Sequence, residues 1–267
     1  MAPLPQRNDP AATGRRRATT TEWSNLRRRA RLWSLTVWII AACCAVHVAR
    51  VLVPGLWVPT EQWGGFNVAD GIYGGQLWRV LSFQFLHGSL LHLGFNCMGL
   101  WIFGPTVERR LGRARFLAYY LLCGVGGALG YALLYWTNLI GGTSAGLLVG
   151  ASAGVFGLIA AAMVLAPDRV LMLAIPPIDI TVFRFGLVLL FVGAVMVVGY
   201  GHYNGSNAGG HAAHLGGAAV GFLLARRIGW LDWAERLAPK AWRSHPGRTA
   251  PEPDVEAPSY MKYHGWR

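Results

Sequence analysis

The sequence is poor in charge. Only 13% of its 267 residues are Asp, Glu, Lys or Arg, whereas 54% are hydrophobic. Soluble domains carry roughly twice this share of charged residues. A chain of this composition lacks the polar groups to cover a surface in water, so we expect much of its surface to face lipid.

Acidic residues are especially scarce, with 12 Asp and Glu against 24 Lys and Arg. The basic residues gather at the two ends: eight arginines lie in residues 1–31, and eight Lys or Arg lie in residues 226–267. Basic ends around an apolar middle are typical of cytoplasmic segments beside anionic lipid. We therefore favour a membrane protein over a nucleic-acid-binding one.

Cysteine is also rare. Cys43, Cys44, Cys97 and Cys123 all lie in apolar stretches, and their spacing fits neither a zinc site nor a disulfide framework. No histidine is followed by glutamate, which excludes the HExxH motif of a metalloprotease. No aspartate lies in the middle of an apolar stretch, which argues against an aspartyl intramembrane protease. We expect no metal and no other cofactor.

The long apolar stretches that are present predict a fold. Each could cross a hydrocarbon core of ~30 Å as a helix, and together they predict an all-α membrane protein, a six-transmembrane helical bundle. Paired prolines interrupt the segment between the fourth and fifth stretches, where we expect an interfacial hairpin. The predicted spans are residues 32–53, 83–103, 116–136, 147–167, 185–200 and 211–224.

Charge predicts the orientation of these spans. With the N-terminus in the cytoplasm, the cytoplasmic segments hold 22 of the 24 basic residues, and only Arg50 and Arg79 fall outside. Both termini are then cytoplasmic. The predicted domains are a disordered basic leader (1–32), a six-span membrane domain (33–227) and a basic tail (228–267) whose first part suits a surface helix.

Ser152 lies in the sequence Gly150-Ala-Ser152-Ala-Gly154. In soluble hydrolases, GxSxG forms a turn between a strand and a helix. Nothing before this segment indicates a strand, and the apolar pattern predicts that the helix continues through it. Small residues around a serine usually allow close helix packing in a membrane, so this motif alone favours packing over catalysis.

His214 is a second polar residue that could act together with Ser152. A histidine within a span is costly and indicates function, and it shares a helix face with Gly217 and Gly221. These glycines would admit another helix, for which Gly150 and Gly154 are the expected counterpart. Ser152 lies about five residues into its span and His214 about three to five, so both should lie at one depth. A base within hydrogen-bond reach would activate the serine.

A third polar group lies in the second span. His92 and Asn96 are four residues apart and share a helix face. Such donors could stabilise the negative charge that develops on oxygen during amide hydrolysis. They could equally form polar contacts that lock helices together, and the residues alone favour neither interpretation.

Taken together, these segments resemble the rhomboid family of intramembrane serine proteases. The resemblance covers roughly residues 33–227 and leaves both ends outside. It rests on motifs that occur in order along the chain: Trp78-Arg79, His87-x4-His92-x3-Asn96, Glu108-Arg109 with Gly112, Gly150-x-Ser152, and His214 with Gly217-x3-Gly221.

The resemblance implies a catalytic Ser–His dyad without a carboxylate. Ser152 would be the nucleophile and His214 the general base and then acid, with His92, Asn96 and the Ser152 N–H as the oxyanion site. Gly150 would leave room beside the serine, Phe156 would pack on His214, and His87 would organise water or a loop nearby. Structural roles fall to the remaining motif residues Trp78, Arg79, Glu108, Arg109, Gly217 and Gly221.

We therefore predict a serine-type endopeptidase that cleaves transmembrane protein substrates near the outer face of a cell membrane, the plasma membrane of a bacterium. The alternative is a non-catalytic rhomboid-like protein that binds or escorts client helices, which has no need of Ser152 and His214 together. A transporter would carry mid-membrane charges or broken helices, and neither is evident. The expected partners are these substrates and the lipid bilayer. The oligomeric state stays open.

Overall fold

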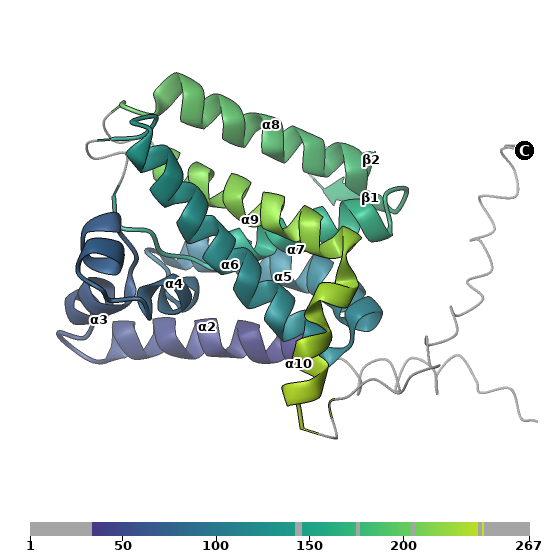
Figure 1. The fold of residues 1–267 in the computed structure, drawn as a ribbon, viewed down its shortest axis with the longest axis horizontal. Helices are drawn as coiled ribbons and strands as arrows, with labels where there is room; N and C mark the ends of the chain where they lie inside the picture. Colours follow the sequence, from purple (N-terminus) through teal and green to yellow (C-terminus); the bar gives the residue numbers. More distant parts are fainter. Residues whose placement is uncertain (1–33, 142–145, 175–176, 204–206, 240–241, 243–267) are drawn as a thin grey trace, which may run out of the picture. The chain divides into compact units, whose positions relative to one another are not determined.

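The computed structural model describes residues 34–141, 146–174, 177–203, 207–239 and 242. This part of the chain is mostly helical (Figure 1). Its long helices are α2 (Leu35–Leu52), α5 (Leu90–Leu111), α6 (Arg113–Trp136), α7 (Ser152–Leu165), α8 (Val182–Tyr200) and α9 (Ala208–Arg226). The shorter elements are α3 (Trp57–Gly64), a π-helix (Ala69–Tyr73), α4 (Arg79–Ser82), 3-10 turns (Phe83–Phe85 and Ile228–Leu231), α10 (Asp232–Leu237), β1 (Val170–Ala174) and β2 (Pro177–Thr181).

Four helices in the described ranges, α2, α5, α6 and α8, are long and apolar enough to cross a membrane. Helix α7 is apolar but has only 14 residues, a length of about 21 Å. Helix α9 has 19 residues, many of them glycine and alanine, and is not among the four. The predicted helical fold is confirmed, and four of its helices could cross a membrane, whereas the count of six spans and the cytoplasmic termini stay predictions.

The predicted second span has the wrong bounds. Its helix begins at Leu90, because the Ser89 side chain accepts a hydrogen bond from the backbone N–H of His92 and caps the helix there. The helix then continues to Leu111, and α6 begins at Arg113. The connection that the predicted spans leave between residues 103 and 116 is thereby reduced to Gly112, whose φ of 80° is a conformation that glycine adopts readily.

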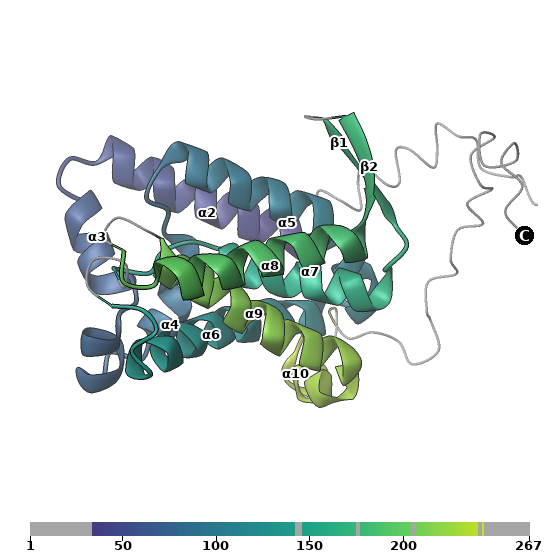
Figure 2. The ribbon, with the colours of Figure 1, turned by 90° about the horizontal axis from the view of Figure 1, so that it is seen from above.

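Other expected connections also differ. The long loop predicted before the second span contains α3, the π-helix and α4. The interfacial hairpin is a β-hairpin in which Leu171 lies opposite Ile180, and it extends away from the helices (Figure 2). The predicted surface helix of the tail is a 3-10 turn followed by α10. The basic leader and the end of the tail lie outside the described residues.

Helix α9 packs most extensively against α6 and α7, with α2 and α8 at opposite edges in Figure 1. Glycines make this packing close. A Cβ added to Gly221 would lie 2.7 Å from the Cα of Gly157. The expectation that Gly150 and Gly154 face α9 is wrong, because a Cβ on Gly150 would meet His92 of α5 and one on Gly154 would meet Tyr120 of α6. The partners of Gly217 and Gly221 on α7 are Ala153 and Gly157.

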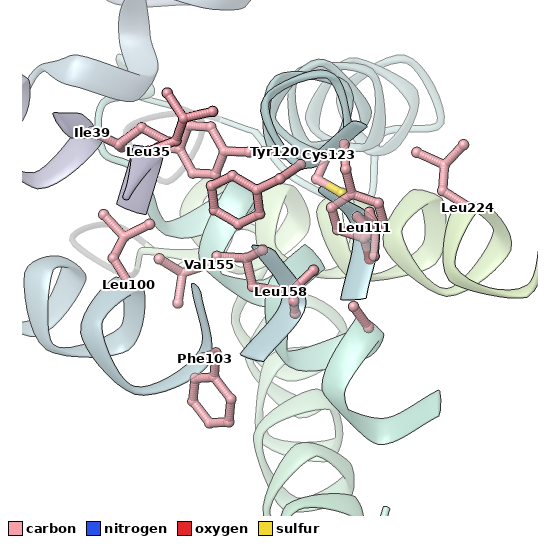
Figure 3. Packing of buried hydrophobic residues seen from close by; sticks show 14 of the residues in the cluster. Leu35, Ile39, Leu100, Phe103, Leu111, Tyr120, Cys123, Val155, Leu158 and Leu224 are labelled. Carbon is pink, nitrogen blue, oxygen red and sulfur yellow. The ribbon is translucent and has the colours of Figure 1, made fainter. Parts of the chain in front are cut away.

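The main core lies among α2, α5, α6 and α7. Tyr120 of α6 is fully buried, and Figure 3 shows it between Ile39 of α2 and Leu158 of α7. Leu100 and Val155 extend the cluster to α5 and α7. This core fixes α5 against α7, and so fixes the helix that carries His92 and Asn96 relative to the helix that begins at Ser152.

Glu108 joins the end of α5 to the start of α2. Its carboxylate accepts hydrogen bonds from the backbone N–H of Leu35 (2.8 Å) and from the N–H (3.1 Å) and hydroxyl (2.9 Å) of Thr36. The first N–H groups of a helix have no partner within it, and a negative charge there is favourable. The buried carboxylate therefore caps α2 from a residue more than 70 positions away.

We expect Glu108→Gln to lower the free energy of unfolding by about 3 kcal/mol, because a charged acceptor is lost and an amide N–H₂ is placed against backbone donors. Thermal unfolding in detergent measures this change. Thr36→Val removes one of the three hydrogen bonds and should cost about 1 kcal/mol. Melting of Glu108→Gln at the wild-type temperature would show that the cap contributes nothing.

Candidate active site

Ser152 is the first residue of α7 and does not lie inside a longer helix. Before it, Leu148 is extended and pairs with Phe66 in an isolated β-bridge. Gly150 then has a φ of 124°, which residues with a side chain rarely adopt. The chain thus passes from an extended segment through a sharp turn into a helix. The prediction that a helix runs through residues 147–151 is therefore wrong.

The structure brings Ser152 and His214 together. The Nε2 atom of His214 lies 2.8 Å from the Ser152 hydroxyl oxygen. The ring of Phe156 stacks on the His214 ring, with centroids 4.2 Å apart and planes within 8°. Among the described residues, Nδ1 of His214 has no hydrogen-bond partner. With the imidazole proton on Nδ1, Nε2 is free to accept the serine proton.

Close contact between α7 and α9 sets this distance. Gly217 lies three residues after His214, and a Cβ there would collide with the backbone of Ala153, the residue after Ser152. The missing side chain lets the two helices approach at the level of the serine and histidine. This contact confirms that Ser152 and His214 lie at one level, although Ser152 is the first residue of α7 and His214 the seventh of α9.

Ser152 and His214 line a pocket of about 530 Å³ together with His92 and Asn96. Asn96 is buried, and its Nδ2 donates to the His92 carbonyl at 2.9 Å. The His92 ring lies over Gly150, where a Cβ would come within 2.7 Å of Nε2. The N–H of Ser152 is in the first turn of α7, where no helical acceptor exists. Donors from α5 and α7 thus face one cavity.

Sequence reasoning missed several other residues of this pocket. Asn207 immediately precedes α9, and asparagine is favoured at this position. The sequence could therefore have indicated that α9 begins here. The others gave no signal, because apolar residues and glycines look alike in a span and in a pocket wall. They are Phe95, Gly146, Leu147, Leu148, Val149, Val155, Gly209 and Gly210.

His87 lies behind the pocket and does not line it. It is fully buried, and its Nε2 accepts a hydrogen bond from the N–H of Ala151 at 3.4 Å. Burial lowers the pKa of His87 to about 4, and the neighbouring His92 adds to the effect. The ring is therefore neutral at pH 7, as an acceptor must be, and it supports the turn before Ser152.

This pKa predicts a loss of stability in acid. The pKa of His87 is about 4 in the folded chain, whereas an unperturbed histidine, as in the unfolded chain, has a pKa of 6.5. Between these values the unfolded chain binds more protons, so the free energy of unfolding falls as the pH falls, by up to about 3 kcal/mol. In thermal unfolding, the advantage of wild type over His87→Gln should shrink between pH 7.5 and pH 4.5. His202→Gln, at an exposed site, controls for the loss of one histidine. A constant difference between wild type and His87→Gln would contradict the assignment.

The remaining motif residues lie away from the pocket. The indole N–H of Trp78 donates to the carbonyl of Trp63 at 2.9 Å. Arg79 is buried, donates to the side chain of Gln76 (2.8 Å) and to the carbonyl of Gly65, and lies 3.6 Å from the carboxylate of Asp70. Arg109 is exposed at the far end of α5. In the ranges described, no three His, Cys, Asp or Glu side chains are placed to hold a metal ion.

These features define a helical membrane protein with a serine and a histidine in hydrogen-bond contact inside the bundle. A family model described as the rhomboid domain matches residues 74–230. The chain belongs to the rhomboid family, a family of intramembrane proteases, as its motifs predicted.

Individual proteins similar to this chain also carry rhomboid names. RHOMBOID-like protein 4 of Arabidopsis thaliana is 34% identical over 168 residues, which cover 61% of this chain and 37% of that protein. YdcA of Bacillus subtilis is 32% identical over 171 residues, 63% of this chain and 74% of YdcA. Rhomboid protease GlpG of Yersinia pestis is 26% identical over 197 residues, 74% of this chain and 63% of GlpG. The chain thus spans less than two thirds of the Arabidopsis protein and of GlpG.

Proposed function

We propose that this protein is an intramembrane serine endopeptidase that cleaves transmembrane segments of other membrane proteins. The observation that carries the proposal is the 2.8 Å contact between the Ser152 hydroxyl and Nε2 of His214, inside a pocket that also holds His92 and Asn96. A hydroxyl next to a neutral imidazole, with donors nearby, is the arrangement that acyl transfer requires.

The reaction follows from these positions. The Ser152 oxygen attacks the carbonyl carbon of the peptide bond while His214 takes the hydroxyl proton. The oxyanion that forms accepts hydrogen bonds from the Asn96 amide, the His92 ring and the Ser152 N–H. His214 then gives its proton to the departing amine, which leaves an acyl-enzyme. Water, activated by His214, hydrolyses the ester and regenerates the serine.

The short α7 suits a site below the membrane surface. Its length of about 21 Å falls short of a ~30 Å hydrocarbon core. If α7 ends near the cytoplasmic face, Ser152 begins the helix below the outer face, and the extended residues before it connect to that face. A substrate helix must unwind here to expose its peptide bond, so glycine, which disfavours helix, should promote cleavage. Small side chains next to the cut suit the crowded surroundings of Gly150.

The location follows from the same proposal. Arginines and lysines at both ends favour cytoplasmic termini, and the bacterial relatives favour a plasma membrane. The name of GlpG describes it as a rhomboid protease, which supports the same activity here.

The test is cleavage of a single-span model substrate by the purified full chain in detergent and in lipid vesicles. Wild type should cut the substrate and should form a covalent adduct with a fluorophosphonate at Ser152. Ser152→Ala should do neither. Equal cleavage by Ser152→Ala would refute the mechanism, and stable binding of substrate without cleavage by wild type would favour the escort function.

A further inference from the structure

Arg50 is a buried charge near the end of α2. Only 3% of the residue is exposed, and its charge alone placed it with Arg79 outside the cytoplasmic segments. Its guanidinium contacts three groups: the carboxylate of Glu61 in α3 (2.7 Å), the ring of Trp57 (3.9 Å to the centroid) and the backbone carbonyl of His87 (3.1 Å). Arg50 is therefore part of the packed interior.

Residues 83–87, which we call the His87 loop, connect Arg50 to the turn that precedes Ser152. On one side the His87 carbonyl accepts a hydrogen bond from Arg50. On the other side its imidazole accepts from the N–H of Ala151. The neighbouring Phe83 carbonyl accepts from the N–H of Gly150 at 2.9 Å. The turn before Ser152 is thus hydrogen-bonded to residues 83–87. Arg50 binds the same segment through the His87 carbonyl.

We propose that Arg50, paired with Glu61, is a positioning residue for Ser152 that acts through the His87 loop and the Ala151 N–H. This inference rests on the proposed function, because its consequence is the rate at which Ser152 attacks. Neither Arg50 nor Glu61 lines the pocket. Both therefore affect the geometry of the turn without contacting substrate.

The chemistry of arginine suits this role. Its two terminal nitrogens point in different directions, so Nη1 binds the His87 carbonyl while Nη2 binds Glu61. The flat guanidinium also lies over the indole of Trp57. Lysine has a single nitrogen and no planar face, and cannot reproduce this set of contacts. Glu61 supplies the negative charge that a buried guanidinium requires.

A purely structural role would look different. Arg50 could simply hold α3 on α2, in which case its loss would weaken the fold without affecting the serine. Trp57→Leu is the matched control, since it removes the packing on the guanidinium face but leaves Glu61 and His87 in contact with Arg50. A structural role therefore predicts a lower melting temperature with an unchanged kcat, whereas a positioning role predicts a lower kcat.

The experiment compares Arg50→Gln, Arg50→Lys, Glu61→Gln and Trp57→Leu in the full chain. For Arg50→Gln we expect a 10- to 100-fold fall in kcat with KM within about twofold, because the pocket walls are unchanged. Arg50→Lys should restore only part of the rate, and Glu61→Gln should lose a few-fold. Trp57→Leu should melt earlier with kcat near wild type.

Hydrogen exchange gives a readout that needs no activity. Peptides covering residues 146–156 should exchange faster in Arg50→Gln than in wild type and Trp57→Leu. If wild type proves inactive, the proposed function fails and this measurement still tests the positioning. Wild-type exchange in this segment, or a wild-type kcat with only a lower melting temperature, would overturn the inference. Should Arg50→Gln not fold, Glu61→Gln serves the same comparison.

Discussion

Replacing His214 with alanine is expected to slow cleavage at least ~1,000-fold, about as much as replacing Ser152. Without the imidazole, no group of the described structure is bonded to the Ser152 hydroxyl to take its proton. Without the hydroxyl, the imidazole has no nucleophile to activate. Initial rates of cleavage of a single-span substrate, at saturating and at low substrate concentration, measure both losses.

The double variant separates a catalytic pair from two independent contributions. Ser152→Ala with His214→Ala should be no slower than either single change, because each already removes the function of the other. His211→Gln is the matched control. Its ring lies 5.5 Å from the His214 ring on the same helix, and its rate should stay within a few-fold of wild type. A His214→Ala variant far more active than Ser152→Ala would show that another group is the base.

The sequence was sufficient to predict the class of fold and the family. Apolar stretches of helical length indicated α2, α5, α6 and α8 because lipid requires them. The family motifs followed from the few polar residues within these stretches, since a histidine or asparagine there needs a reason to be present. His214 and Asn96 were found in this way, and both line the pocket.

The start of α7 could not be predicted from hydropathy. Leu147, Leu148 and Val149 are apolar because they line the pocket wall, and their pattern looks the same as that of a helix. Only Gly150 indicates the turn, and this glycine was interpreted as a site of close contact with another helix. Similarly, Ala153 gave no sign that it would face Gly217, because alanine is common on every face of a membrane helix.

Long-range polar contacts were also invisible. Arg50 and Glu61 are 11 residues apart on different helices, and no periodicity connects them. Charge counting placed Arg50 only on the outer side of the membrane and identified no partner for it, and the structure buries it against Glu61. The partner of Glu108 at the start of α2 was hidden for the same reason.

Replacing Gly217 with valine is expected to lower cleavage roughly 100-fold or more, since a shift of reacting groups by ~1 Å has effects of this size. The new Cβ would collide with the Ala153 carbonyl and lie 2.8 Å from its carbon. Backbone cannot rotate away as a side chain can, so α9 must move off α7. His214, one turn away, moves with it and leaves Ser152. Overpacking should also cost about 1–3 kcal/mol of stability.

Two other glycines tell this effect from general damage. Gly221→Ala creates a similar collision, with Gly157 and the Tyr119 hydroxyl, but lies two turns below His214. It should lower the melting temperature while retaining more activity than Gly217→Ala. Gly199→Ala meets no atom within 4 Å and should behave as wild type. If Gly217→Ala and Gly221→Ala lost activity only in proportion to stability, the α7–α9 contact would support the fold without setting the Ser152–His214 distance.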